Sequence, residues 1–182
     1  MTSEFTKNTR IRLRNLSINT AMSEETIAFT ATVYFDGVKI GHASNRGTGG
    51  ATTFDRVYYA FESIREAQDR KINEAIEWAK TLSVPTPKAF VESLGPEMRM
   101  EGLEDWIDAL VAEEDDIRKA KRQLKRLLAR MIVVVDGDVA KTLKTAWDTS
   151  KRAQVLKQLP NAVILNELPF PEALERFRKV TQ

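Results

Sequence analysis

The sequence predicts an α+β fold: an N-terminal three-stranded antiparallel meander, a long antiparallel helical hairpin, and C-terminal short strands and helices that complete the sheet. In the first third of the chain, apolar residues alternate with polar ones, as in strands with one buried face. In the middle third they recur every three to four residues, as in amphipathic helices. We therefore divide the chain into segments 1–56, 57–130 and 131–182, and expect them to form one globular domain.

The meander is predicted from a strand at Arg10–Ile18 and a hairpin at Thr26–Asn45. The hairpin turns at Asp36-Gly37, because glycine tolerates the positive φ of a type I′ turn. The next stretch, residues 46–53, is rich in Gly and Thr and has no periodicity. We expect it to end the meander as a loop.

The two-residue turn fixes the expected register of the hairpin. It pairs Phe35 with Val38 and Val33 with Ile40, which places all four on one buried face. The only histidine, His42, would lie on the same face. A structural histidine is the simpler interpretation, and a catalytic base is the alternative.

Two long helices follow, at Val57–Leu82 and Glu101–Met131, with a short helical turn near 88–92 between them. The second helix has an apolar residue at every seventh position: Leu103, Leu110, Ile117, Leu124 and Met131. Such a heptad stripe indicates helix-on-helix packing, so we expect an antiparallel arm. Apolar surface left over on this arm would favour a homodimer or a partner helix.

The last segment combines short strands and helices. Ile132–Val135 and Ala162–Leu165 are apolar enough for strands, and Lys141–Leu159 has helical spacing. A terminal helix opens at Phe170-Pro171, because proline is favoured in the first helical turn.

The composition excludes several classes of protein. The chain has no cysteine, which rules out disulfides and thiolate metal sites, and we expect no cofactor. Met1–Asn8 lacks the pattern of a signal peptide, and no apolar run is long enough to span a membrane, so we expect a cytoplasmic protein. The formal charge of +2 does not identify a partner.

Two sets of basic residues are candidate binding sites. Arg10, Arg12 and Arg14 would form a row on one strand face, able to contact phosphates or an acidic protein. In the second long helix, eight acids before Arg118 give way to seven bases from Arg118 to Arg130. The candidates there are Arg118, Lys121, Arg122 and Lys125, although the helix macrodipole also favours this polarity and a plain solvated face remains an alternative.

The Gly-rich stretch is a third candidate. Gly47, Gly49 and Gly50 could present backbone N–H groups to an anion, with Arg46 and Arg56 on the flanks. The spacing matches neither a Walker loop nor a dinucleotide-binding loop. A purely structural loop is the alternative.

The residues Ile132 to Asp138 resemble the strand and paired aspartates that open the haloacid dehalogenase phosphotransferases. This resemblance implies a metal-dependent phosphatase or nuclease that uses Asp136 and Asp138. Ala140 departs from that family's pattern, and only 44 residues follow Asp138. A strand that ends in an Asp-Gly turn explains the same residues, and we expect no metal site.

A second string resembles the opening of small uncharacterised proteins of bacteriophages, plasmids and mobile elements. It consists of Ser23-Glu24-Glu25-Thr26, Phe29, Ala31, Tyr34, Asp36-Gly37, Gly41, Asn45, Gly47 and Gly49-Gly50. The resemblance implies a protein that binds host machinery stoichiometrically, including as an inhibitor of host defence. We therefore expect a non-enzymatic protein that binds a host protein or nucleoprotein complex, with direct nucleic-acid binding as the alternative.

Overall fold

The computed structural model describes residues 9–59, 61–81 and 102–181. The protein is α+β, as predicted, and divides into two compact units, Thr2–Asp115 and Asp116–Gln182. We call them the N-terminal unit and the C-terminal unit. The boundary lies inside helix α4 (Leu103–Leu128), so the compact units do not coincide with the segments 1–56, 57–130 and 131–182.

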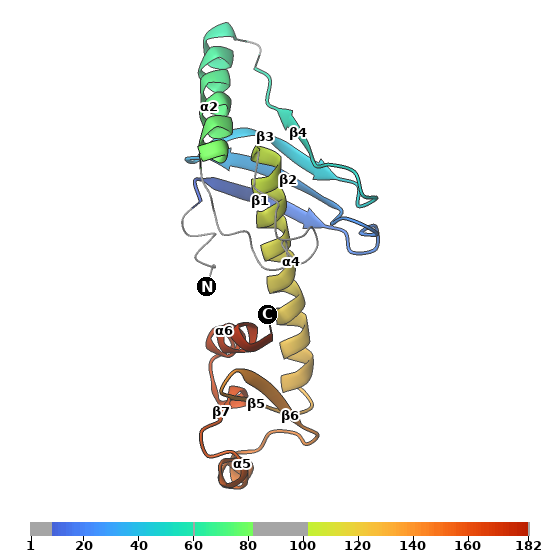
Figure 1. Ribbon diagram of the computed structural model, residues 1–182, viewed down its shortest axis with the longest axis vertical. Coiled ribbons are helices and arrows are strands. Elements are labelled where there is room, and N and C mark those ends of the chain that lie inside the picture. The colour runs from blue at the N-terminus through green and yellow to red at the C-terminus, as the bar shows by residue number, and fades with distance from the viewer. Residues whose placement is uncertain (1–8, 60, 82–101, 182) are drawn as a thin grey trace. The chain divides into compact units, whose positions relative to one another are not determined.

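The N-terminal unit contains an antiparallel sheet in the order β1-β2-β3-β4 (Figure 1). Its strands are β1 (Ile11–Ile18), β2 (Phe29–Phe35), β3 (Val38–Asn45) and β4 (Thr53–Arg56). The prediction that the meander has three strands and ends at residues 46–53 is therefore wrong. The chain turns through Gly47 and Gly49, which have φ of +87° and +86°, and Thr53 pairs back onto Ser44.

The turn between β2 and β3 is confirmed, because Asp36 and Gly37 have φ of 47° and 81°. The predicted register is wrong beyond the turn. Tyr34 pairs with Lys39 and Val33 with Gly41, so a bulge leaves Ile40 as the extra residue on β3.

This bulge decides which side chains are buried. Val33, Phe35 and Ile40 are fully buried, as expected, whereas Val38 beside the turn is 42% exposed. His42 pairs with Thr32 rather than with Ala31 and is exposed. His42 is thus neither a core residue nor on the apolar face.

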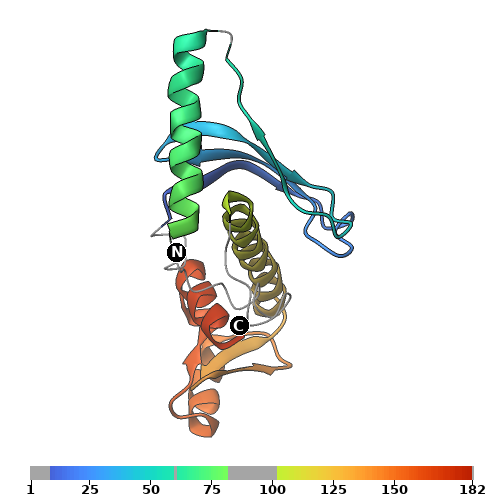
Figure 2. The ribbon, with the colours of Figure 1, turned by 45° about the horizontal axis from the view of Figure 1, so that its top comes forward.

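Helix α2 (Glu62–Thr81) and the first half of α4 cover the apolar face of this sheet (Figure 2). The core joins Ile72, Ala75 and Ala79 of α2 to Trp106, Ile107 and Leu110 of α4 and to the inward-facing strand residues. The two helices meet where α2 ends, since Trp106 Nε1 donates a 3.2 Å hydrogen bond to the Ala79 carbonyl.

The start of α2 differs from the prediction. The helical spacing of Val57–Leu82 places Phe61 and Ile64 in line with the buried Ile72, but both are exposed, because the first turns of α2 extend past the sheet (Figure 1). Leu82 and the helical turn predicted near 88–92 lie outside the described residues.

Three of the five residues of the heptad stripe are buried within the chain itself. Leu103 and Leu110 lie in the core of the N-terminal unit, and Leu124 lies in that of the C-terminal unit. A homodimer through this stripe stays a prediction, and this burial does not favour it.

The C-terminal unit has its own sheet, in the order β6-β5-β7. Its strands are β5 (Ile132–Asp136), β6 (Val139–Leu143) and β7 (Val163–Ile164). The prediction that these strands complete the first sheet is wrong. A tight turn at Gly137 (φ 61°) folds β6 back onto β5, so residues 141–143, predicted as helix, become strand.

Helices cover both faces of this second sheet. The second half of α4 and α6 (Phe170–Thr181) pack on the face that carries Val133, whereas η1 (Thr149–Lys151) and α5 (Arg152–Gln158) lie toward the face with Ile132 and Val134. The short helix η2 (Leu165–Glu167) contains Asn166, whose Oδ1 accepts a 2.8 Å hydrogen bond from Val133 N. This side chain thereby extends the pairing of the short strand β7.

Candidate nucleic-acid interface

The C-terminal unit is strongly basic. Residues 116–182 contain 15 lysines and arginines and 7 acids, for a net charge of +8, whereas residues 2–115 carry −6. Because the two charges have opposite signs, the net charge of the whole chain is only +2. Residues 2–102 contain 13 bases and 13 acids, so the first half of α4 carries the whole negative balance of the N-terminal unit.

The positive charge of the C-terminal unit is concentrated on the second half of α4. Leu124 points into the core, and the solvent-exposed positions of this half are Lys119, Lys121, Arg122, Gln123, Lys125 and Arg126. Five of these six are basic and none is acidic. We call these five cations the basic face of α4.

Part of this surface is predicted from the sequence. Lys121, Arg122 and Lys125 are exposed, as a binding role requires, whereas Arg118 is half-buried. Lys119 and Arg126 were not singled out individually, although their spacing on the helix places them beside Arg122.

The helix macrodipole explains only part of the basic face. Its favourable effect on cations is confined to the last turn of a helix, which here holds Lys125 and Arg126. Lys119, Lys121 and Arg122 lie one to two turns earlier, where the dipole contributes little. The macrodipole therefore does not account for these three cations.

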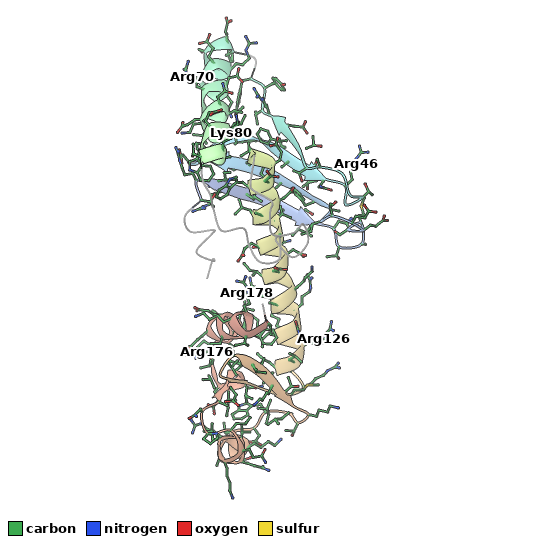
Figure 3. The ribbon with its side chains drawn as sticks, in the orientation of Figure 1. Arg46, Arg70, Lys80, Arg126, Arg176 and Arg178 are labelled. Atoms are coloured by element: carbon green, nitrogen blue, oxygen red, sulfur yellow. The ribbon has the colours of Figure 1, made fainter. Side chains whose placement is uncertain are left out.

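Two cations of α6 form ion pairs with acids of the same helix. Arg176 Nη2 lies 3.3 Å from Glu172 Oε1, and Lys179 Nζ lies 3.4 Å from Glu175 Oε1. Within the described ranges, no ion pair reaches Lys121, Arg122 or Arg126. Figure 3 shows Arg126 and Arg176 on opposite sides of the α4–α6 pair. Lys121, Arg122 and Arg126 are thus the members of the basic face that no acid neutralises in the described part of the chain.

Arg10, Arg12 and Arg14 do not form the predicted row. Arg10 precedes β1 and turns to the face covered by α2, where its guanidinium lies 4.3 Å from the Phe35 ring centroid. It also forms ion pairs with Asp36 and with Glu74 of α2, the latter at 2.6 Å. These contacts make Arg10 a structural residue.

The same ion-pair cluster shifts the pKa values of its members. The hydrogen bond from Arg10, with help from Lys71, lowers the pKa of Asp36 to about 2. Lys71 and Arg10 also lower the pKa of Glu74. All four groups are therefore charged at neutral pH.

Arg12 and Arg14 lie on the opposite, outer face of the sheet. Both are exposed, and the Arg14 guanidinium lies 4.5 Å from the Tyr34 ring centroid. Arg12 also bends back to donate a 2.7 Å hydrogen bond to the Thr9 carbonyl. Two of the three predicted arginines therefore lie on one face.

The Gly-rich stretch forms a clasp with residues 24–26 instead of an anion site. Asn45 Oδ1 accepts hydrogen bonds from Gly47 N (2.8 Å) and Thr26 Oγ1 (2.9 Å). The Gly47 carbonyl accepts from the N–H groups of residues 24, 25 and 26. The N–H groups expected to bind an anion are thus engaged internally, at least at Gly47 and Gly49.

Two further features oppose anion binding there. The Glu25 carboxylate lies beside Gly49, and a strand rather than a helix N-terminus follows the stretch. Arg46 is exposed (Figure 3). Arg56 Nη1 lies 3.9 Å from Asp69 Oδ1 of α2. Gly50 has open space around it. Several members of the N-terminal string meet in this clasp, so the string specifies local structure.

One half-buried acid was missed by sequence reasoning. Asp108 of α4 accepts a hydrogen bond from Thr52 Oγ1, which connects the end of the clasp to the helix. Burial, reinforced by the nearby charges of Asp105 and Glu104, raises its pKa to about 6. Only its place in the acid-rich half of α4 hinted at its role.

Asp136 and Asp138 stand at a hairpin turn, as the structural interpretation predicted. Asp136 ends β5, and its Oδ2 lies 2.7 Å from Lys141 Nζ. β5 pairs antiparallel with both neighbours, unlike the parallel sheet of the phosphotransferases. In the described part of the chain, no three His, Asp or Glu side chains gather as metal ligands.

The fold and the charge distribution define an α+β protein with a basic surface on its C-terminal unit. No helix within residues 9–59, 61–81 and 102–181 is both long and apolar enough to cross a membrane. Comparison with models of known protein families gives no match, and neither a curated protein nor a solved structure is detectably similar to the chain.

Proposed function

We propose that this protein is a non-enzymatic binding protein that contacts nucleic acid, as part of a nucleoprotein complex, through the basic face of α4. The single observation that supports this most is that Lys121, Arg122 and Arg126 are exposed and uncompensated in a unit of net charge +8. Such a surface attracts phosphates over long distances and releases counterions when it binds them.

The make-up of the basic face favours contact with the backbone of a duplex. Bases are stacked by aromatic side chains, and this face has none. Lysines and arginines on an exposed helix instead contact phosphates, largely without regard to sequence. An acidic protein surface would satisfy the same charges, and the experiment below separates the two.

A protein partner is supported by a different observation. Tyr58, Tyr59, Phe61 and Ile64 are 82%, 39%, 72% and 45% exposed, and they are four of the seven large hydrophobic residues exposed among the described residues. Exposed apolar clusters of this kind mark protein interfaces, and tyrosine is enriched at their energetic centres. A nucleoprotein complex would offer partners for both surfaces, and the mobile-element resemblance makes a host complex the target we expect.

The test compares two pairs of substitutions in the same unit. Lys121→Gln with Arg122→Gln removes two charges from the basic face, whereas Arg176→Gln with Lys179→Gln removes two from α6. Fluorescence anisotropy with a labelled duplex should show weaker binding for the first pair only. Equal affinities for both pairs, or binding of an acidic protein but not of duplex by the wild type, would refute the proposal.

A further inference from the structure

The outer face of the N-terminal sheet carries a second, differently built cationic surface. Directly paired residues of an antiparallel sheet lie on the same face. Arg14 pairs with Thr32, Thr32 with His42, and His42 with Asp55, which gives one row across all four strands. The next row joins Arg12, Tyr34 and Lys39.

Tyr34 stands among the three cations of this face. Arg12 and Lys39 are its paired neighbours on either side, and the Arg14 guanidinium stacks on its ring at 4.5 Å. Helices α2 and α4, the helices described in this unit, pack on the other face through the core cluster. A planar guanidinium and an aromatic ring are thus presented together on the face opposite these two helices.

The remaining side chains of the outer face are polar. A third row consists of Ser17, Thr30, Ser44 and Thr53, which offers hydroxyl groups only. Asp55, on the edge strand β4, is the one acid in the three rows. The three rows therefore combine three positive charges and one negative charge with hydroxyl groups and a stacking surface, and none of their members is aliphatic.

We infer that this face binds a segment of single-stranded nucleic acid. Its charge is complementary to phosphates, hydroxyls can bond to phosphate and sugar oxygens, and an unpaired base can stack on Tyr34 or on the Arg14 guanidinium. A duplex buries its base faces, so it cannot use this stacking surface. The inference rests on the proposed function, to which it adds a second surface with a different strand preference.

The test uses the full chain, a labelled oligothymidine and a labelled duplex of mixed sequence. Arg14→Gln with Lys39→Gln removes two charges from the outer face, and Arg70→Gln with Lys80→Gln removes two from α2 of the same unit (Figure 3). The first pair should weaken binding of the oligothymidine by about tenfold, as expected for the loss of one stacked base with its phosphate contacts. It should leave the duplex affinity unchanged.

Tyr34→Phe provides a further arm, because it keeps the ring and should retain most of the oligothymidine affinity. If the outer-face pair and the α2 pair bind oligothymidine equally, the inference is overturned while the proposed function stands. The proposed function fails separately if Lys121→Gln with Arg122→Gln leaves the duplex affinity intact. An oligothymidine that does not bind the wild type also overturns the inference.

Discussion

Arg10 Nε donates a 2.9 Å hydrogen bond to Asp36 Oδ1, which connects the residue before β1 to the turn between β2 and β3. Lys71 of α2 joins this pair, with its Nζ 3.0 Å from Asp36 Oδ2. The cations of Arg10 and Lys71 both lie over the Phe35 ring, 4.3 and 5.0 Å from its centroid. The cluster fixes α2 on the hairpin at the edge of the core.

The first prediction concerns this cluster. Asp36→Asn keeps a residue that tolerates the positive φ, but it removes the charge that Arg10 and Lys71 neutralise. Because the pair is about one-third exposed, we expect a loss of roughly 0.5–1 kcal/mol in the free energy of unfolding at pH 7.

The pH dependence gives the check. The folded pKa of Asp36, about 2, lies below its ordinary value of 3.8, so its stabilisation is complete above pH 3.8 and is lost as the pH falls through 2. In urea unfolding, the difference in free energy of unfolding between the variant and the wild type should shrink to zero as the pH falls over this range. Asp138→Asn, an exposed turn residue, is the control and should change little. A loss of stability in Asp36→Asn that does not depend on pH would show that the charge of Asp36 is not its cause.

A pH effect of opposite sign is expected at Asp108. Its folded pKa of about 6 lies above the ordinary 3.8, so the group favours folding below pH 3.8 and this contribution disappears as the pH rises through 6. Asp108→Asn should therefore match the wild type near pH 4 and exceed its stability at pH 8, by at most about 3 kcal/mol. Thermal unfolding at both pH values measures this, and a variant less stable at pH 8 would show that the carboxylate is needed.

The corrected register of the hairpin makes its own prediction. Phe35→Ala should cost about 3–5 kcal/mol, because it leaves a cavity in the core beneath Arg10 and Lys71. His42→Ala should change the stability by less than about 0.5 kcal/mol, because His42 is exposed. Similar losses for both variants, measured by chemical denaturation, would place His42 in the core after all.

The geometry of the clasp predicts how strongly an alanine substitution destabilises the protein at each of three glycines. An added Cβ at Gly47 would collide with the Met22 carbonyl, at Gly49 it would meet the flexible Glu25 side chain, and at Gly50 it would meet nothing. Gly47 and Gly49 also have positive φ, which costs other residues about 1–2 kcal/mol. Alanine substitutions should therefore lower the melting temperature most at Gly47, less at Gly49 and least at Gly50. Any other order would contradict the described clasp.

Much of this fold could be predicted from local sequence patterns. The Asp36-Gly37 turn, both long helices and the strand at 132–135 follow from glycine placement and apolar spacing. β4 was missed because four residues after a Gly-rich stretch carry too little periodicity. The register of β3 was missed because the bulge at Ile40 leaves no mark in the sequence.

The division into two units was also missed, although a signal existed. The change from acidic to basic residues near Arg118 falls close to the unit boundary inside α4. The same change locates the basic face, so Lys121, Arg122 and Lys125 could be predicted. The surroundings of Tyr34 could not, because they depend on pairing across three strands.

The salt dependence of duplex binding tests the central claim most directly. Each phosphate contact contributes about −0.9 to the slope of log affinity against log salt concentration. The slope for the wild type should be steep. Lys121→Gln with Arg122→Gln should make it shallower by about 1.8, which is the contribution of two phosphate contacts. Arg176→Gln with Lys179→Gln should leave it unchanged. If the wild type shows no slope, or if all three proteins share one slope, the basic face of α4 does not bind nucleic acid.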